Sequence, residues 1–296
     1  MHALWMLLAA LLFGVMGAFV KLAAAGHGIA EIVFFRSLFG FAALGAWVRW
    51  NGLALRTPLA WLHLRRSVIG VTALALWFYS LSFLPLGTAT TLNYTSSLFL
   101  ALFTVAMALV LGRPLNRLLV GAIAVGFVGV VLVLQPSLSE GQTGPALVGL
   151  LSGLLPAVVY WHVRELGRAD EPEWRTVFYF SLGGLLLGVA GMAITGITQP
   201  TPRSALYLVG VGLSAMLAQL AMTRAYGRGG TLLPANLQYA TVPLSALLGL
   251  WLFDEPLQLT SWIGIAIIVG SSVLATWLGA ARPAAVTPRD AVRAAE

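Results

Sequence analysis

Long apolar stretches recur along the whole chain of 296 residues. A helix needs about 20 consecutive apolar residues to cross the hydrocarbon core of a bilayer. Ten stretches meet this requirement, and we expect helices at residues 3–24, 32–50, 68–84, 88–111, 115–134, 146–163, 176–197, 205–226, 232–253 and 257–278. None alternates apolar and polar residues as the strands of a membrane β-barrel do. The sequence therefore predicts an all-α polytopic membrane protein with ten transmembrane helices.

The composition agrees with this class and excludes others. Charged residues make up 9% of the chain and hydrophobic residues 59%, whereas about 25% of a soluble domain is charged. An ordinary soluble protein, a disordered chain and a nucleic-acid-binding domain are therefore excluded. The net charge of +7 comes mainly from short gaps between the apolar stretches, which indicates membrane topology and contact with anionic lipid. The absence of cysteine excludes disulfides, thiolate nucleophiles and cysteine metal sites.

Basic residues are distributed unevenly between the two sides of the predicted helices. If both termini are cytoplasmic, 14 of the 17 Lys and Arg residues fall on the inner side, and Lys21, Arg36 and Arg203 fall on the outer side. Cytoplasmic loops of membrane proteins are enriched in Lys and Arg. We therefore expect a multi-pass protein of the inner (cytoplasmic) membrane with both termini in the cytoplasm and the lipid bilayer as its surroundings.

Two parts of the sequence match each other. ALVLGRPLNRLLVGAIAVG and GLWLFDEPLQLTSWIGIAIIVG share an apolar run, a polar turn, Pro-Leu and a Gly-bearing helix, and upstream LNYTSSLFLAL matches LQYATVPLSAL, which aligns Tyr94 with Tyr239. We expect a first five-helix repeat over 1–136, a second over 144–280 and a cytoplasmic tail over 281–296. Because five is odd, the second repeat enters the membrane inverted. Inverted repeats are typical of secondary transporters, which bind cargo near the bilayer midplane.

These paired segments, together with FFRSLFG at 34–40 and FYSLSFLPLGTATTLNYTSSLF at 78–99, resemble the drug/metabolite transporter superfamily, EamA type. The resemblance covers essentially the whole chain. It implies ten helices in two inverted halves, cytoplasmic termini, and a central cavity lined mainly by helices 1, 3, 4, 6, 8 and 9. It also implies a Glu in the turn before helices 5 and 10. Glu255 supplies it in the second half, whereas Arg113 stands there in the first.

Polar residues cluster at equivalent places in the fourth and ninth helices. Asn93 and Tyr94 belong to the first cluster, and Asn236, Gln238 and Tyr239 to the second. Polar side chains are costly in lipid, so they face a cavity or another helix. If the clusters face each other across the pseudo-two-fold axis, they line one polar site. The alternative is that they only join helices together.

Three more residues complete the predicted cargo site. Trp77 and Tyr79 in the third helix suit an organic cargo with apolar parts or a cation stacked on a ring, whereas Phe78 between them can equally serve helix packing. Gln219 in the eighth helix has no evident reason to face lipid. The predicted substrate-binding residues are therefore Trp77, Tyr79, Asn93, Tyr94, Gln219, Asn236, Gln238 and Tyr239.

A few residues near the predicted site have two interpretations. We favour an ion pair of Glu31 with Lys21 or Arg36 while the remaining cation reaches the outer surface; the alternative makes Arg36 a gate or a contact of a cargo carboxylate. Pro156 in the sixth helix leaves a backbone carbonyl without its helical partner, which a broken helix can present to cargo.

The pattern predicts a carrier rather than an enzyme. No HExxH or Walker A motif and no paired nucleophile and base occurs in the spans, so we expect no catalysis, no metal and no cofactor. The expected function is secondary transport of a small organic metabolite by alternating access, with the two halves rocking around the cavity. The expected cargo is an amino acid or related compound; the alternative is an adenosylated or cationic amphipathic metabolite. A membrane-embedded enzyme and a non-transporting scaffold are the alternatives from other classes.

Energy coupling and assembly follow less directly from the sequence. Proton-coupled carriers usually place a carboxylate inside the membrane, and the predicted spans hold none beyond Glu31 near one end. We therefore favour transport down a gradient or by exchange. The sequence leaves a homodimer open.

Overall fold

The computed structural model describes residues 2–112, 117–139, 141–226 and 236–280. Within these ranges it has α-helices and one 3-10 helix and no strand, so the predicted all-α class is confirmed. The elements are α1 (His2–Ala24), α2 (Ile29–Trp50), α3 (Ala60–Phe83), α4 (Leu86–Asn93), α5 (Ser96–Val110), α6 (Arg117–Ser139), α7 (Thr143–Arg168), α8 (Glu173–Thr195), α9 (Pro202–Tyr226), η1 (Gln238–Ala240), α11 (Thr241–Phe253) and α12 (Leu259–Ala280).

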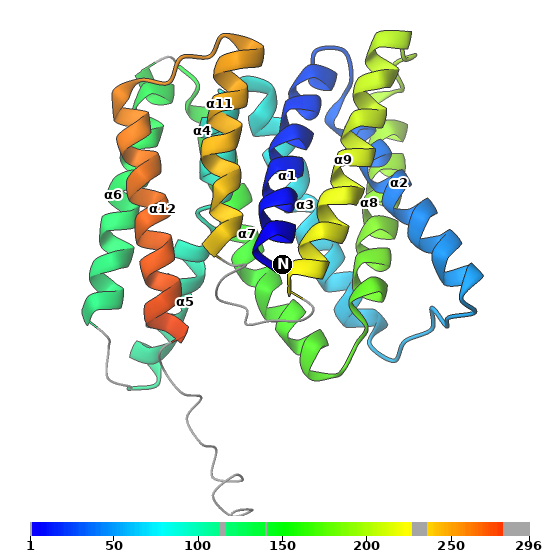
Figure 1. Cartoon of the computed structure of the whole chain (residues 1–296), viewed down its shortest axis with the longest axis horizontal. Coiled ribbons are helices and arrows are strands. Elements are labelled where there is room, and N and C mark those ends of the chain that lie inside the picture. The colour runs from blue at the N-terminus through cyan, green and yellow to red at the C-terminus, as the bar shows by residue number, and fades with distance from the viewer. Residues whose placement is uncertain (1, 113–116, 140, 227–235, 281–296) are drawn as a thin grey trace, which may run out of the picture.

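Ten of the described segments correspond to the ten predicted spans. Eight are long and apolar enough to cross a membrane, and α4 together with α5 counts as one of them. Two shorter apolar segments, Thr143–Val159 and Gln238–Phe253, bring the number to ten. The first helix begins and the last helix ends on the same side of the bundle, low in the view of Figure 1. The multi-pass architecture is therefore confirmed.

Two boundaries differ from the predicted ones in a way that matters for the site. Helix α3 starts at Ala60, well before the predicted start at 68, so Arg66 lies within a helix and not in a loop. The fourth span is not continuous, because Tyr94 and Thr95 separate α4 from α5. The predicted turn at 113–116, the start of the ninth span at 232–235 and the tail at 281–296 lie outside the described residues.

The helices of the two repeats pack on each other in a symmetric pattern. Helix α1 packs on α9, and its counterpart α7 packs on α3. Helix α2 packs on its own counterpart α8, and α6 packs on α12. An inverted repeat produces such reciprocal contacts. The predicted arrangement of two inverted five-helix repeats is therefore confirmed.

Small residues between α2 and α8 follow the same symmetry. Gly40 of α2 faces Ser181 of α8, and Gly184 of α8 faces Ser37 of α2. A Cβ atom on either glycine would collide with the opposite serine hydroxyl. Helices in lipid associate through such close contacts, because the hydrophobic effect does not drive them together there. The small residues therefore set the spacing of this helix pair.

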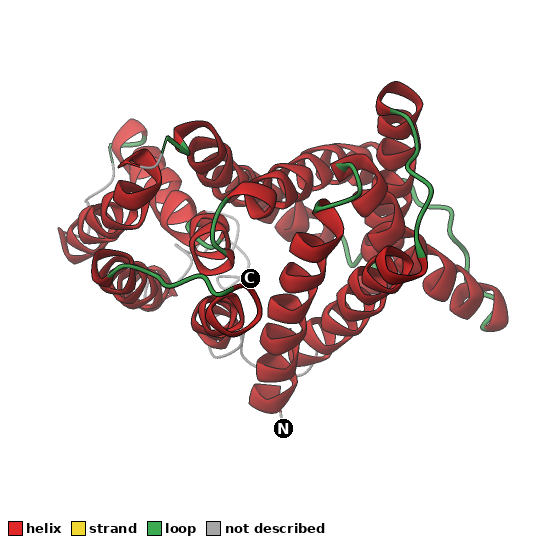
Figure 2. Cartoon of the chain, turned by 90° about the horizontal axis from the view of Figure 1, so that it is seen from above, coloured by secondary structure: helices red, strands yellow, loops and turns green. Residues whose placement is uncertain are grey.

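The bundle forms two groups of helices, each built from both repeats. The first group consists of α4, α5, α6, α11 and α12, at one end of the view in Figure 1. The second consists of α1, α3 and α7 near the centre and α2, α8 and α9 at the other end. Figure 2 shows the same two groups from above. The groups meet where α1 packs on α11 and where α7 packs on α4 and α5. The repeats are therefore intertwined rather than placed side by side.

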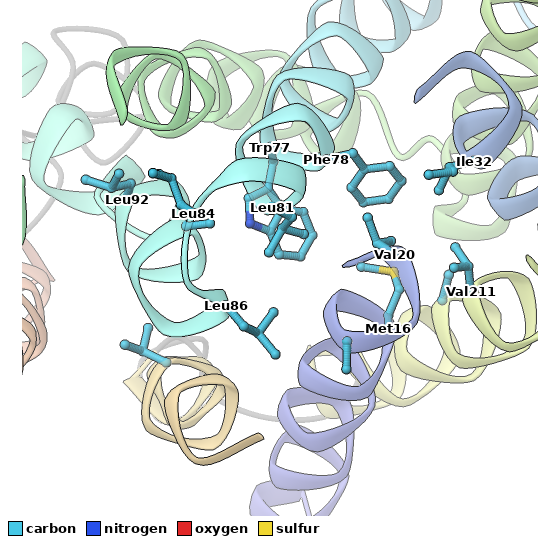
Figure 3. Close-up of a cluster of buried hydrophobic side chains, with 14 of the residues drawn as sticks. Met16, Val20, Ile32, Trp77, Phe78, Leu81, Leu84, Leu86, Leu92 and Val211 are labelled. Atoms are coloured by element: carbon cyan, nitrogen blue, oxygen red, sulfur yellow. The ribbon is translucent and has the colours of Figure 1, made fainter. Parts of the chain in front are cut away.

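The apolar core is centred on α3. Phe78 and Leu81 of this helix are fully buried, and Met16 of α1, Ile32 of α2 and Val211 of α9 are buried in the same cluster. Figure 3 shows Phe78 directed toward Ile32, with Trp77 on the neighbouring face of the helix. The core thus fixes how α3 is rotated about its axis, and with it the residues that α3 presents to the cavity described below.

Polar contacts join two connecting segments at the lower end of the bundle. His63 Nε2 lies 2.9 Å from Glu171 Oε1, and Arg175 donates to the same oxygen at 3.1 Å. Arg175 also donates to the carbonyl of Ala54 at 2.8 Å. Burial raises the pKa of the Glu171 carboxyl, but hydrogen bonds from His63, Arg175 and Thr57 outweigh it and leave the pKa below its ordinary 4.5. The carboxylate is therefore the form that holds this cluster together.

This cluster makes stability depend on pH. Because the pKa of Glu171 is lower in the folded state than in the unfolded state, its contribution is present at neutral pH and is lost as the pH falls below 4.5 through the folded value. We expect Glu171→Gln to cost about 2 kcal/mol at neutral pH, as is usual for hydrogen bonds to charged groups, and the difference from wild type to vanish in acid. Thermal unfolding of purified protein across pH measures this.

The control for this prediction is Glu165→Gln, which changes an exposed acid of α7. It should match wild type throughout the pH range. A Glu171→Gln penalty that stayed constant into acid would show that the carboxylate charge is not what stabilises the cluster.

The crossing of α6 and α12 requires glycine. A Cβ atom on Gly129 would lie 2.9 Å from the carbonyl oxygen of Gly264, and one on Gly264 would lie 2.7 Å from the carbonyl oxygen of Gly129. We expect Gly129→Ala to cost about 1–3 kcal/mol, because overpacking against a backbone atom forces the helices apart. Gly121→Ala, in the same helix but with open space around the new methyl group, should leave the melting temperature unchanged or raise it. Thermal unfolding in detergent compares the two; equal melting temperatures would contradict the prediction.

Candidate substrate-binding cavity

A cavity of about 210 Å³ lies where helices of both repeats meet. Its walls come from α1, α2, α3, α4, α5, α7, α8, α9 and η1. These elements include all the helices that the family resemblance implies, and add α2 and α8. The lining residues are Phe13, Met16, Arg36, Gly70, Ala73, Leu74, Trp77, Asn93, Tyr94, Ser96, Pro156, Phe180, Met222, Gln238 and Tyr239.

Five of the eight residues predicted to bind cargo line this one cavity. They come from three spans that are distant in sequence, and they are Trp77, Asn93, Tyr94, Gln238 and Tyr239. The two polar clusters of the fourth and ninth spans therefore face a common space. Aromatic rings and amides together make a wall that is apolar over most of its area with a few polar groups, as is usual for sites that bind small organic molecules.

The paired tyrosines meet across the symmetry axis. Their ring centroids lie 6.1 Å apart with an interplanar angle of 62°. Tyr94 donates a hydrogen bond to Thr241 Oγ1 at 3.0 Å, and Tyr239 donates one to Ser97 Oγ. Each hydroxyl thus binds the span that carries the other tyrosine, and these reciprocal bonds hold both rings in the cavity wall.

Both tyrosines lie where a spanning helix is irregular. Tyr94 sits between α4 and α5, and Tyr239 lies in η1 just before α11. At the first break the Thr95 hydroxyl donates to the carbonyl of Leu92 at 2.6 Å, which supplies a partner to a carbonyl near the break. Irregular backbone at membrane depth occurs where protein or a cavity surrounds it, and transporters use it at cargo sites. The equivalent breaks in the two repeats therefore mark the cavity as the candidate site.

A proline in α7 positions Asn93. Pro156 has no N–H group, so the carbonyl of Ser152 one turn earlier lacks its usual helical partner. The Asn93 side-chain amide donates to this carbonyl and to the Ser152 hydroxyl, both at 3.2 Å. The carbonyl that Pro156 leaves open is therefore occupied by Asn93, which it orients at the cavity wall.

The other three predicted residues lie elsewhere. Gln219 lines a smaller cavity of about 30 Å³, which shares Arg36 and Phe180 with the main one. Asn236 is not among the residues that line either cavity, and its Oδ1 is buried without a hydrogen-bond partner. Tyr79 lies outside both cavities, 38% exposed, with its ring 4.8 Å from that of Phe83.

The place of Tyr79 follows from helix geometry. Residues two positions apart lie about 200° apart around a helix, so Trp77 and Tyr79 cannot both face the cavity. Trp77 is 5% exposed and packs with the core, which turns Tyr79 outward. Sequence alone identified the aromatic residues of α3 but not the rotation of the helix.

The expected ion pair of Glu31 is wrong. Glu31 lies 2.7 Å from His27 Nδ1, one turn earlier on the chain, and also accepts hydrogen bonds from the backbone of Gly28 and Thr198. Arg36 does not reach the outer surface; it is buried and lines both cavities. The neighbouring histidine binds the carboxylate, so Glu31 is not the partner of Arg36.

Lys21 instead pairs with an acid of the second repeat. Its Nζ lies 2.5 Å from Glu255 Oε1 and donates to the carbonyl of Leu84 at 2.5 Å. Glu255 Oε2 accepts the backbone N–H of Leu86 at 2.8 Å. This network, at the upper end of the bundle in Figure 1, joins the end of α1 to the α3–α4 connection and the α11–α12 connection. The network therefore connects three segments at this end of the bundle. In the sequence, Glu255 was identified only through the family resemblance.

Apolar lining residues gave no signal in the sequence. Phe13, Met16, Phe180 and Met222 resemble the many lipid-facing residues around them and can be assigned to the cavity only from the fold. No group of three or more metal-ligating side chains occurs in the described part of the chain.

Known proteins resemble this chain over at least nine tenths of its length. The pseudopaline exporter CntI of Pseudomonas aeruginosa is 32% identical over 269 residues, which cover 90% of this chain and 93% of that protein. A riboflavin transporter of Rhizobium johnstonii is 31% identical over 283 residues, covering 92% and 89%. One crystal structure shares the fold with a TM-score of 0.63 at 24% identity, over 94% of this chain and 96% of that one.

The family assignment rests on both repeats. The EamA-like transporter family matches residues 1–135 and again residues 144–277, so each half of the chain contributes one match. Together with the inverted arrangement of the helices, this shows that the chain belongs to the EamA-like transporter family.

Proposed function

We propose that this EamA-type transporter is a secondary carrier that moves a small organic metabolite across the cytoplasmic membrane by alternating access. The observation that carries the proposal is the shared cavity, where Tyr94 and Tyr239 meet at equivalent helix breaks of the two repeats. Transport of organic molecules by the related pseudopaline exporter and riboflavin transporter supports the same class of function. No Asp, Glu, His or Cys is among the residues that line the cavity.

The cavity favours a small cargo with an aromatic or apolar part. Its volume of about 210 Å³ is below the range of about 300–1,000 Å³ that is usual for drug-sized ligands. Trp77, Tyr94 and Phe180 provide ring faces and edges, and Asn93 and Gln238 provide amides. An amino acid or related compound fits this description. An adenosylated or cationic metabolite fits the rings but would face the buried charge of Arg36.

We propose that the moving parts are the two helix groups and not the two repeats over 1–136 and 144–280. Rocking of the repeats as rigid bodies would separate α1 from α9, α2 from α8 and α6 from α12, which are packed closely along their lengths. Movement of the groups leaves these pairs intact. It would instead break the Lys21–Glu255 pair, which links α1 to the α11–α12 connection across the group boundary. The cavity has walls from both groups, so this movement would expose it to alternate sides.

The first test asks whether the tyrosines contact cargo. Proteoliposomes are loaded with a water-soluble metabolite extract, and mass spectrometry identifies the compounds that leave unchanged. We expect Tyr94→Ala and Tyr239→Ala to lower the rate about tenfold, which corresponds to about 1.4 kcal/mol, because each loses a ring and a hydrogen bond in the cavity wall.

The matched control for that test is Tyr79→Ala, which removes an outward-facing tyrosine and should transport at the wild-type rate. Wild-type rates in both cavity variants would remove the tyrosines from the cargo site. If the wild-type protein releases no compound, the carrier function itself fails, and a chemically altered product would indicate an enzyme.

The second test concerns orientation in the inner membrane. Because the chain has no cysteine, single cysteines can be introduced without other changes. We expect a membrane-impermeant maleimide to label Arg203→Cys in cells whose inner membrane is accessible from outside, and to label Arg65→Cys and Arg113→Cys only after the membrane is opened. Labelling of Arg65→Cys and Arg113→Cys from opposite sides would contradict the proposed topology.

A further inference from the structure

Two arginines inside the bundle have no acidic partner among the side chains that the structure describes. The guanidinium carbons of Arg36 in α2 and Arg66 in α3 lie 4.9 and 4.8 Å from the ring centroid of Phe180 in α8. The Nε atoms of both arginines, and Nη1 of Arg66, are buried without a hydrogen-bond partner. Within the described ranges neither forms an ion pair, and Glu31 and Glu255 are already occupied by His27 and Lys21.

This arrangement is costly without a ligand. An ionisable side chain at membrane depth is expensive and is normally paired or functional. The two guanidinium groups also repel each other through the space around Phe180. A cation over an aromatic ring regains only part of the cost. Two positive charges lie around one ring, and no described side chain supplies a negative charge to either of them. An anionic ligand would supply it.

The geometry directs this charge at the cavity. Arg36 and Phe180 line both the large cavity and the small one beside it. Gly70, one turn after Arg66, keeps the space beside the ring open, because a Cβ atom there would lie 3.0 Å from Phe180. Trp77 also lines the large cavity, and its indole N–H is a second buried donor without a partner. Donors without partners in the wall match a ligand that accepts hydrogen bonds.

We propose that Arg36 binds an anionic oxygen group of the cargo, a carboxylate or a phosphate, and that Arg66, which contacts the same Phe180 ring, adds a second positive charge. Guanidinium groups bind both kinds of anion through paired N–H donors. The proposal rests on the carrier function and narrows it: the cargo is an acid or a zwitterion rather than a purely cationic compound.

Binding to purified protein tests this with small matched probes. Phenylacetate and phenyl phosphate carry the two kinds of anion on a ring, and phenylacetamide is a neutral analogue of the first with nearly the same shape. We expect at least one of the two anions to raise the melting temperature and phenylacetamide not to do so. The anion that binds identifies the group that Arg36 recognises.

Substitutions then assign the binding to Arg36. We expect Arg36→Gln to weaken binding of the anionic probe at least about tenfold and Arg36→Lys to retain part of it. Arg203→Gln, which removes an exposed arginine at the start of α9, should bind as wild type does. Absence of binding by both anions, equal binding of phenylacetamide, or unchanged binding in Arg36→Gln would each overturn the proposal.

Stability without any probe separates a binding role from a structural one. If Arg36 is kept for cargo, removing its unpaired charge should raise the melting temperature of empty Arg36→Gln protein. A residue needed for packing would lower it instead, and that outcome would count against the proposal.

Transport distinguishes the failure of this site from the failure of the carrier function. In the metabolite release assay, we expect the compounds released by wild type to carry a carboxylate or phosphate and Arg36→Gln to release them at least about tenfold more slowly. Release at the wild-type rate by Arg36→Gln would remove the anion site while leaving the carrier intact. Anion binding through Arg36 with no release by wild type would keep the site and remove the carrier.

Discussion

Backbone N–H and C=O groups in the hydrocarbon region must find hydrogen-bond partners within the protein. This constraint explains the contacts around the two helix irregularities next to the cavity, the break between α4 and α5 and the proline in α7. The break at Tyr94 and Thr95 is tolerated because Thr95 binds the carbonyl of Leu92 and because α7 covers the break closely through Gly153. Pro156 opens a carbonyl in α7, and Asn93 fills it. The first defect is satisfied by a side chain of the break itself and the second by Asn93, which lines the cavity.

The inverted repeat turns one such break into a site. Because equivalent spans of the two repeats meet at the symmetry axis, Tyr94 and Tyr239 exchange hydrogen bonds with each other's spans. Their hydroxyl groups are thereby used within the wall. Arg36 Nε and the Trp77 N–H are instead buried donors without a hydrogen-bond partner. Equivalent spans of the two repeats thus form the cavity, and Arg36 gives its wall a positive charge.

The features that the lipid environment imposes could be predicted from the sequence, whereas the rotation of the helices and the apolar cavity residues, which depend on packing, could not. Ten spans and two inverted halves follow from hydropathy, and polar residues such as Asn93 and Gln238 were found because they are rare in lipid. Tyr79 and Trp77 look alike in sequence, and only the packing of Phe78 in the core determines which of them faces inward. Phe13 and Phe180 carry no signal, because an apolar residue in a span suits lipid and cavity equally. The partner of Glu31 was missed because His27 lies before the helix.

The charges of the cavity bear on energy coupling. Proton-driven carriers usually place a carboxylate inside the membrane, but no Asp or Glu is among the residues that line the cavity, and Glu31 is bound by His27 and the backbone N–H of Gly28 near one end of α2. The charged side chain in the cavity wall is instead Arg36, which is positive. An anionic cargo bound there would lower the free-energy cost of the conformational change that moves the cavity from one side of the membrane to the other. In the return step without cargo, the positive charge of Arg36 would not be neutralised. That asymmetry favours exchange of one anionic metabolite for another over one-way transport coupled to protons.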